Sequence, residues 1–225
     1  MNATATQTPR VIYADDTLIA ISKPSGLLSV PGRGPDKQDC AHRRVLADFS
    51  DALIVHRLDM GTSGILIFAR GIDMLRVLGR QFETRQVHKR YTAIVRGSLP
   101  EKTGEIDLPL LTDWERRPRQ KVDRESGKPA LTRYTVRSVD AASGRSQVDL
   151  KPVTGRTHQL RVHLAALGTP IVGDPLYGTE EERLAGLHAA PDSAFFPRLL
   201  LHAEQLAIHH PKTGVPLLIE DPAPF

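Results

Sequence analysis

The chain has 225 residues, of which 40% are hydrophobic and 25% charged, and its formal net charge is +4. This length and balance are ordinary for a soluble globular protein with a substantial core. No apolar run approaches the roughly 20 residues that a membrane-spanning helix needs, so a helical membrane protein is excluded. The single cysteine, Cys40, cannot form an internal disulfide, and we therefore expect a cytoplasmic protein.

The predicted elements follow in chain order. Residues 1–9 are polar and lack the charged and apolar regions of a secretory signal, which predicts a disordered tail. Strand-like runs cover residues 11–21 (interrupted by a turn at Asp15-Asp16), 65–69, 91–95, 131–139, 146–150, 206–209 and 215–219. Amphipathic spacing predicts helices over residues 73–85 and 157–167, the latter ended by Gly168, and a third helix is expected over residues 39–47.

These elements predict an α+β fold. Strands outnumber helices, so we expect a large, mixed, mostly antiparallel sheet with flanking helices and loops. The sequence shows no repeat and no interdomain linker, and we expect one domain over residues 10–225.

The most informative stretch is residues 55–64, VHRLDMGTSG. It lies between apolar runs, so Arg57 and Asp59 are carried on a short loop that joins buried elements. Rigid scaffolds often present reactive side chains in this way. The pattern favours a reactive Asp59 over a structural salt bridge between Asp59 and Arg57.

A second informative segment is basic. The chain has 22 arginines against 8 lysines, and guanidinium groups bind phosphate through a bidentate fork. Residues 113–133 hold seven cations and four anions without clean periodicity, and they include Arg116 and Arg119. This segment predicts an irregular loop that contacts an RNA backbone, with a solvated loop of mixed salt bridges as the alternative.

The motif HRLD at residues 56–59, followed by TSG at 62–64, resembles the signature of the RluA family of RNA pseudouridine synthases. Five further blocks resemble the same family in the same order. They are residues 23–32 (KPSGLLSVPG), 89–91 (KRY), 152–163 (PVTGRTHQLRVH), 173–178 (GDPLYG) and 198–204 (RLLLHAE). Six ordered blocks are far more specific than one short motif.

The resemblance implies a pseudouridine synthase catalytic fold with a central active-site cleft. It points to the short branch of the family, which has no S4 RNA-binding domain. Members isomerise uridine in structured RNA, here a loop of 23S rRNA and the anticodon stem-loop of tRNA. The reaction gains and loses no atoms, so no cofactor is expected.

The resemblance also implies catalytic roles for three residues. Asp59 matches the carboxylate that acts at the ribose, either as a nucleophile at C1′ or as a base at C2′. Arg161 matches the arginine that pairs with this aspartate; its alternative is a surface position on an amphipathic helix. Tyr91 matches the tyrosine that stacks on the uracil, whereas its residue pattern alone favours a core aromatic in a strand.

Further residues are candidates for RNA binding or loop support. Arg57 is the candidate for the side chain that replaces the extruded base, and His56 is expected to support its loop. Arg156, near a predicted helix start, is a candidate phosphate contact. Lys23 and Lys151 are candidates for phosphate contact or loop support, with a solvated surface lysine as the alternative.

No metal site is expected. The nine histidines include no HExxH motif, and His158 and His163, five residues apart, do not share a helix face. The segment GRGP at residues 32–35 lacks the Lys-Ser/Thr ending of a P-loop.

Two other functions remain open at this stage. A non-catalytic RNA-loop chaperone would need cations and aromatics but no central aspartate. A base-releasing N-glycosidase would liberate free uracil. We expect a monomer, since no coiled-coil pattern or long apolar edge is evident.

Overall fold

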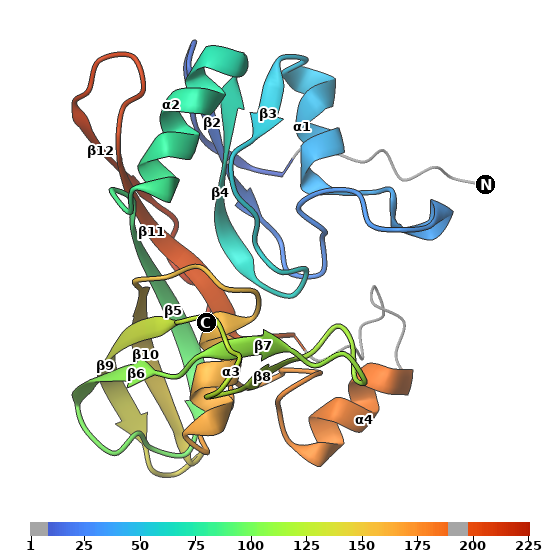
Figure 1. Cartoon of the computed structure of the whole chain (residues 1–225), viewed down its shortest axis with the longest axis vertical. Helices are drawn as coiled ribbons and strands as arrows, with labels where there is room; N and C mark the ends of the chain where they lie inside the picture. The colour runs from blue at the N-terminus through green and yellow to red at the C-terminus, as the bar shows by residue number, and fades with distance from the viewer. Residues whose placement is uncertain (1–8, 189–197) are drawn as a thin grey trace. The chain divides into compact units, whose positions relative to one another are not determined.

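The computed structural model describes residues 9–188 and 198–225 (Figure 1). Its contacts divide the chain into two compact units. Unit 1 comprises Met1–His88 and Ala203–Pro224, and unit 2 comprises Lys89–His202 with Phe225. The single domain expected over residues 10–225 stays a prediction. Of the expected N-terminal tail, residues 1–8 lie outside the described residues, and Pro9 is buried.

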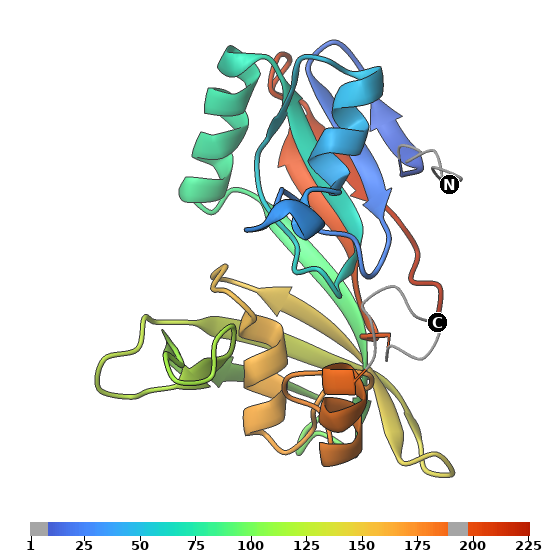
Figure 2. The same cartoon turned by 90° about the vertical axis from the view of Figure 1, so that its right-hand side faces the viewer.

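Where the structure describes it, unit 1 has six strands, two α-helices and one 3₁₀ turn, and the first two residues of its strand β11 belong to unit 2. They are β1 (Val11–Ala14), β2 (Leu18–Lys23), a 3₁₀ turn (Pro35–Lys37), α1 (Ala41–Asp48), β3 (Ala52–Ile54), β4 (Ser63–Arg70), α2 (Ile72–Glu83), β11 (Leu201–His209) and β12 (Pro216–Glu220). The strand order is β1-β2-β4-β11, with β3 also paired to β4 and β12 to β11. Helix α1 packs beside β3, and α2 packs along β4 (Figures 1 and 2).

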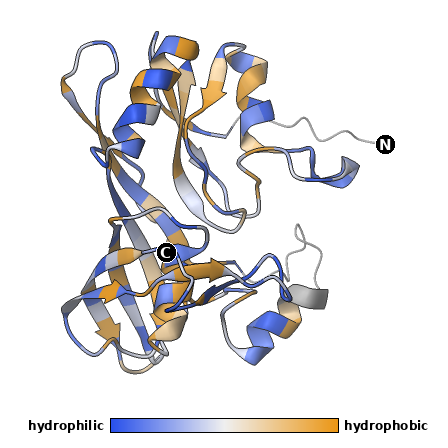
Figure 3. Cartoon of the chain, in the orientation of Figure 1, coloured by the Kyte–Doolittle hydropathy of each residue, from blue (hydrophilic) through white to orange (hydrophobic). Residues whose placement is uncertain are grey.

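Strand β4 forms the centre of unit 1 because its sequence is apolar on both faces. Seven of its eight residues are buried, and only Arg70 is partly exposed. Ile65 and Ile67 contribute to a core that also includes Leu78 of α2. Hydrophobic and hydrophilic residues alternate along α2 (Figure 3), so the helix covers this core with one face.

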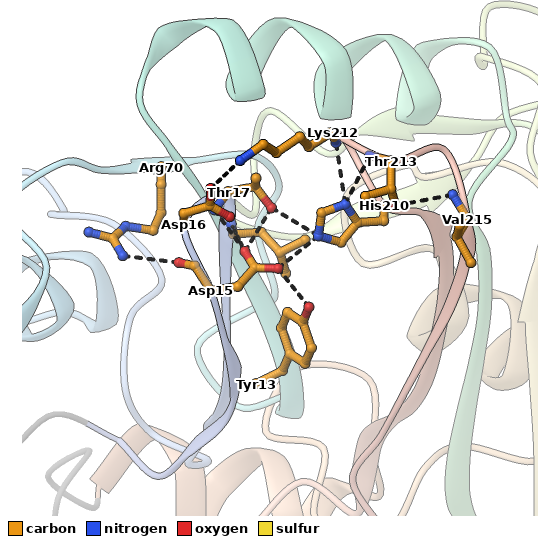
Figure 4. A network of polar contacts seen from close by, with 10 residues as sticks. Tyr13, Asp15, Asp16, Thr17, Arg70, His210, Lys212, Thr213 and Val215 are labelled. Carbon is orange, nitrogen blue, oxygen red and sulfur yellow. Dashed lines mark hydrogen bonds and ion pairs between the residues drawn. The ribbon is translucent and has the colours of Figure 1, made fainter.

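Hydrogen bonds around Asp15 fix the turn between β1 and β2 (Figure 4). Its carboxylate accepts from Tyr13 Oη at 2.6 Å, from the Thr17 backbone N–H at 2.7 Å and from the Leu18 N–H at 3.0 Å. Nε2 of His210, which follows β11, lies 2.7 Å from the same carboxylate. Partial burial alone would raise the pKa of Asp15, but these hydrogen bonds hold it well below its usual range.

The described residues of unit 2 form six strands and two helices. They are β5 (His88–Arg96, whose first residue belongs to unit 1), β6 (Thr103–Asp107), β7 (Leu110–Thr112), β8 (Gln120–Val122), β9 (Leu131–Asp140), β10 (Arg145–Pro152), α3 (Gln159–Ala166) and α4 (Glu180–His188). The order is β5-β10-β9-β6, and every pairing in it is antiparallel. Leu160 and Leu164 of α3 pack into the core of this sheet.

The fold class predicted from the sequence is confirmed. Over the described residues, ten strands belong to one large sheet, and few helices flank it. The basic segment 113–133 is more ordered than expected, since β7 and β8 form a two-stranded antiparallel sheet at its start. We call residues 110–122 the basic hairpin.

Candidate active site

Asp59 lies in the loop between β3 and β4, residues 55–62, which we call the Asp59 loop. Leu58 is 7% exposed and anchors the loop in the core. Arg57 on one side of this anchor is exposed, and Asp59 on the other side is half-buried. The Asp59 carbonyl accepts from the Thr62 N–H at 3.1 Å, which closes a turn. The loop therefore presents its cation to solvent and its carboxylate in a partly desolvated position.

His56 fixes the start of the Asp59 loop. Its Nε2 accepts from the backbone N–H of Ile67 in β4 at 3.2 Å, so this nitrogen carries no proton. Its ring stacks on Phe82 of α2, with 4.9 Å between centroids. This geometry matches the proposed role of His56 in supporting the loop.

Segment 23–32 holds the Asp59 loop through its serines. The Ser29 hydroxyl donates to the Leu58 carbonyl at 2.7 Å and accepts from the Leu58 N–H at 3.0 Å. The Ser25 hydroxyl donates to the carbonyl of Gly61 at 2.7 Å. These bonds fix the loop backbone on both sides of Asp59, and they give this block of the sequence a structural purpose.

Lys23 is fully buried in the same place. Its Nζ donates to the carbonyl oxygens of Pro24 at 2.9 Å, Leu27 at 2.8 Å and Met60 at 3.1 Å. Burial lowers the pKa of Lys23 to about 7, and the carboxylate of Asp59 opposes this shift. Of the roles considered for Lys23, the geometry favours loop support over contact with a phosphate or a solvated surface position.

The end of the loop requires glycine at residue 64. Gly64 has a φ of 107°, and a Cβ added there would lie 2.3 Å from the carbonyl oxygen of Ala203. Any side chain would force β4 away from β11 and displace the loop that precedes it.

Arg161 of α3 lies in unit 2 and is 5% exposed. Its Nε and Nη2 donate to the two carboxylate oxygens of Asp174 at 2.8 and 2.7 Å. Asp174 also accepts from the N–H groups of Leu176 and Tyr177 at 2.9 and 3.1 Å. Burial alone would raise the pKa of Asp174, but Arg161 and these backbone donors hold it below its usual value.

Asp174 is a partner of Arg161 that sequence reasoning missed. It lies in the block 173–178 that carried the resemblance, but the sequence gives no sign of its partner. The alternative reading of Arg161 as a surface residue is wrong, because the side chain is buried. The predicted pairing of Arg161 with Asp59 stays a proposal, and Asp174 fixes one edge of the guanidinium for it.

Tyr177 connects Arg161 to the basic hairpin within unit 2. The Arg161 guanidinium lies 5.1 Å from the centre of its ring, and that of Arg119 lies 5.4 Å away. Its hydroxyl accepts from the Gln120 N–H at 2.7 Å and lies 2.8 Å from Nδ1 of His158. Burial raises the pKa of Tyr177 to about 12, so the phenol stays protonated at neutral pH.

Tyr91 lies in β5, opposite Leu150 of β10, and is half-buried. It packs against the core of unit 2. A core position in a strand and a role at the uracil are therefore both compatible with its placement, and the catalytic role stays a proposal.

The remaining predicted contacts lie on the surface of unit 2. Lys151 in β10 is exposed. Arg116 is exposed and bonds Asp113 at 2.8 Å, whereas Arg119 is half-buried. Arg156 is exposed, and its Nε donates to the Pro129 carbonyl at 3.1 Å. Helix α3 begins at Gln159, two residues later than predicted, so Arg156 lies three residues before the helix. Its contact with a phosphate stays a prediction.

The predicted catalytic residues are thus divided between the units. Asp59, with Arg57, His56 and Lys23, lies in unit 1, and Tyr91 and Arg161 lie in unit 2. Over the described residues, no three His, Cys, Asp or Glu side chains are grouped as a metal site would require. His163 is buried between Thr132 Oγ1 and the Leu108 carbonyl, at 3.0 Å from each.

Within residues 9–188 and 198–225, no helix is long and apolar enough to cross a membrane.

Known proteins resemble this chain over nearly its whole length. Residues 17–166 match the family model described as RNA pseudouridylate synthase. The dual-specificity RNA pseudouridine synthase RluA of Escherichia coli K12 is 47% identical over 215 residues, covering 96% of this chain and 93% of the relative. The protein of the same name from Pasteurella multocida is 46% identical over equal shares.

A solved structure extends this likeness to the fold. Human RNA Pseudouridylate Synthase Domain Containing 1 superposes with a TM-score of 0.78 at 30% identity. The match covers 100% of this chain and 87% of the human chain.

We predict that the stability difference between wild type and Lys23→Met depends on pH. The folded pKa is about 7 against an ordinary 10.5, so between these values the unfolded chain binds more protons than the folded chain. The free energy of unfolding of the wild type should therefore rise with pH relative to the variant. We expect a relative rise on the order of 1–3 kcal/mol from pH 7 to 9, measured by urea denaturation.

Lys37→Met, which removes an exposed lysine of unit 1, is the matched control for loss of a charge. If the free energies of unfolding of wild type and Lys23→Met differ by the same amount at pH 7 and pH 9, the lowered pKa of Lys23 is contradicted.

We predict that Asp174→Asn strongly destabilises the protein. The variant removes the carboxylate that binds Arg161 inside unit 2, and breaking a buried ion pair costs about 3 kcal/mol or more. The control is Glu105→Gln, which removes a partner of the exposed Arg133 at 2.7 Å and should cost about 1 kcal/mol or less. Urea denaturation measures both, and equal costs would show that the Arg161–Asp174 pair contributes no more than a surface pair.

Proposed function

Since the chain belongs to the RNA pseudouridylate synthase family, we propose that Asp59 is the carboxylate with which it isomerises uridine to pseudouridine in structured RNA. The observation that carries this proposal is the Asp59 loop. Its backbone is held by Ser25, Ser29 and Lys23, while its carboxylate is only half-buried. A reactive group needs this combination of fixed position and access to substrate.

The reaction requires one carboxylate. Cleavage of the bond between C1′ and N1 places positive charge on the ribose and negative charge on the departing uracil. A carboxylate beside the sugar can add to C1′ or remove a proton from C2′. Glycosidases use two carboxyl groups because they must also activate water and protonate a leaving group. Here the uracil stays, turns and rejoins through C5, so no water is consumed.

Arg57 suits the task of exposing the target base. Extruding a nucleotide costs a few kcal/mol in lost stacking and pairing, and a side chain that fills the vacated space offsets part of this cost. Arg57 is exposed, and it lies two residues from Asp59 on the same fixed loop. Insertion of Arg57 would therefore bring the extruded nucleotide to the carboxylate.

Arg161 and Tyr91 complete the proposed site. Asp174 fixes the Nε and Nη2 edge of Arg161, so this guanidinium loses little freedom on binding a second carboxylate. We propose that it pairs with the carboxylate of Asp59 and orients it. Tyr91 is proposed to stack on the uracil and to assist loss of the C5 proton after the base has rejoined.

The proposed substrates are a hairpin loop of 23S rRNA and the anticodon stem-loop of tRNA. Relatives at 46–47% identity are described as dual-specificity enzymes. Exposed cations on unit 2 are the proposed phosphate contacts, and they are Arg116, Lys151 and Arg156 together with the half-buried Arg119. One enzyme can serve two RNAs if it recognises a loop shape more than a long sequence.

We also propose a cytoplasmic monomer that needs no cofactor and no metal. The lone, buried Cys40 supports the cytoplasm, and a reaction that gains and loses no atoms supports the absence of a cofactor.

We predict that Asp59→Asn abolishes isomerisation and leaves RNA binding largely intact, because the amide keeps the shape of the carboxylate but not its charge. The measurement is tritium release from rRNA and tRNA that carry [5-³H]uridine, with free uracil assayed in parallel. Asp73→Asn, which alters an exposed carboxylate on α2, is the control and should release tritium as the wild type does.

Other outcomes would replace the proposal. Free uracil would indicate an N-glycosidase. Tight binding by the wild type without tritium release from either RNA would indicate a loop chaperone. Loss of binding in Asp59→Asn would give Asp59 a structural role.

We predict that the double variant Arg116→Ala/Arg119→Ala binds RNA more weakly and with less salt dependence. Each lost phosphate contact should reduce the slope of log K against log salt by about 0.7–0.9. The control is Arg76→Ala/Arg80→Ala, which removes equal charge from exposed positions on α2. RNA binding is measured by filter retention at several salt concentrations. Equal slopes in both double variants would show that Arg116 and Arg119 do not contact phosphates.

A further inference from the structure

Trp114 is exposed in a way that folding does not explain. It is the only tryptophan of the chain, and it lies in the turn of the basic hairpin between β7 and β8. It is 67% exposed, more than any other large hydrophobic residue in the described part of the chain. Such a side chain adds little to the core and exposes apolar surface to water.

The guanidinium of Arg117 lies over the ring of this tryptophan. Its central carbon is 3.5 Å from the centre of the indole ring, well within the range of a cation–π contact. Arg117 covers part of the ring and is itself exposed. Since Trp114 remains two-thirds exposed beside Arg117, most of the indole is open to a ligand.

The turn that carries the pair is fixed rather than loose. Asp113 is 6% exposed, and its N–H donates to the Arg119 carbonyl at 3.0 Å. Its carboxylate accepts from Nε of Arg116 at 2.8 Å. The Gln120 N–H donates to the buried Tyr177 hydroxyl at 2.7 Å. A ligand that stacks on Trp114 would therefore order little of the protein chain, which favours binding.

The surroundings of the pair are cationic. Exposed cations of the hairpin and the loop after it are Arg116, Lys121, Arg124 and Lys128, and the exposed anions are Glu115 and Glu125. Two of the cations are paired, Arg116 with Asp113 at 2.8 Å and Lys121 with Asp123 at 3.4 Å, which leaves an excess of positive charge with Arg117. Aromatic rings among cations form the platforms that bind unpaired nucleic acid, because every base has a face that can stack and every nucleotide carries a phosphate.

We propose that Trp114 and Arg117 form a stacking platform for an unpaired nucleobase of the RNA substrate, outside the uridine that reacts. In paired A-form RNA the bases are stacked within the helix, so only a loop, bulge or end presents a free face. The platform would select loops over duplexes, which phosphate contacts alone cannot do. This inference rests on the proposed function, because that function makes RNA the ligand.

The test uses the fluorescence of the single tryptophan. The full-length Asp59→Asn variant is titrated with an RNA hairpin that has an unpaired loop, and with a blunt RNA duplex of the same phosphate number. Binding is followed separately by the anisotropy of labelled RNA. We expect the hairpin to quench the tryptophan emission along its binding curve and the duplex to bind without quenching. Hairpin binding without quenching, or equal quenching by both RNAs, would overturn the proposal.

Variants connect the platform to turnover. Trp114→Ala should raise the KM for the hairpin roughly 5- to 150-fold, the range expected for one lost base–aromatic stack. Its kcat should stay within about twofold, because the lost contact is equally present in ground and transition states. The KM of Trp114→Phe should lie between those of the wild type and Trp114→Ala. Arg117→Gln should raise KM less than Trp114→Ala does. Val139→Ala, which alters another exposed apolar residue of unit 2, is the control.

The possible failures are distinguishable. A wild type that isomerises uridine while Trp114→Ala keeps its KM would overturn the platform alone. Quenching of the tryptophan by the hairpin, together with a wild type that forms no pseudouridine, would overturn the proposed function and leave the platform in place. A fall in the melting temperature of Trp114→Ala, together with weak binding, would assign Trp114 a structural role and overturn the platform.

Discussion

The candidate site depends on the hydrogen bonds that the buried ammonium group of Lys23 donates to backbone carbonyls. Three carbonyl oxygens, from Pro24, Leu27 and Met60, converge on Nζ inside unit 1. An apolar residue in place of Lys23 would remove this donor from all three acceptors, of which the Met60 carbonyl would keep the Gly26 N–H at 2.9 Å. Carbonyls that lose their hydrogen bonds away from water lower the stability of the fold. The charge is itself expensive to bury, as its lowered pKa shows. The nearby carboxylate of Asp59 offsets part of that cost, so the loop and its reactive group are stabilised together.

Unit 2 uses the same principle with a complete ion pair. Arg161 and Asp174 are both nearly inaccessible, and the bidentate contact fixes the guanidinium plane. Buried pairs rarely increase stability over an apolar core, because desolvation cancels most of the attraction. What such a pair does supply is a defined direction for the remaining donors of the arginine. Burial of the pair therefore costs free energy but fixes the orientation of the Arg161 guanidinium, in agreement with its proposed role toward a carboxylate.

The sequence predicts elements with strong periodicity and misses those without it. The apolar run of β4 and the amphipathic spacing of α2 were clear, whereas β3 and β7 have only three residues each and give no pattern of their own. Asp59 could be proposed as the reactive carboxylate, because a carboxylate on a loop between apolar strands is unusual. The burial of Lys23 could not, because lysine is almost always exposed. Nor could the pairing of Arg161 with Asp174, since thirteen residues separate them and only the fold brings them together.

The surface charge of the chain leads to a last point about selectivity. A net charge of +4 is modest for a protein that must bind RNA, and phosphate contacts add affinity for every RNA alike. Selection of a loop must then come from features that only a loop possesses, namely unstacked bases and a backbone that can deform. In the proposed function, the fixed Asp59 loop with the exposed Arg57 takes the target base out of its stack. The basic hairpin, with Trp114 against Arg117, offers a surface for a base that is already free. The two proposed roles thus use the two features that only a loop possesses: extrusion needs a backbone that can deform, and the platform needs a base that is already unstacked.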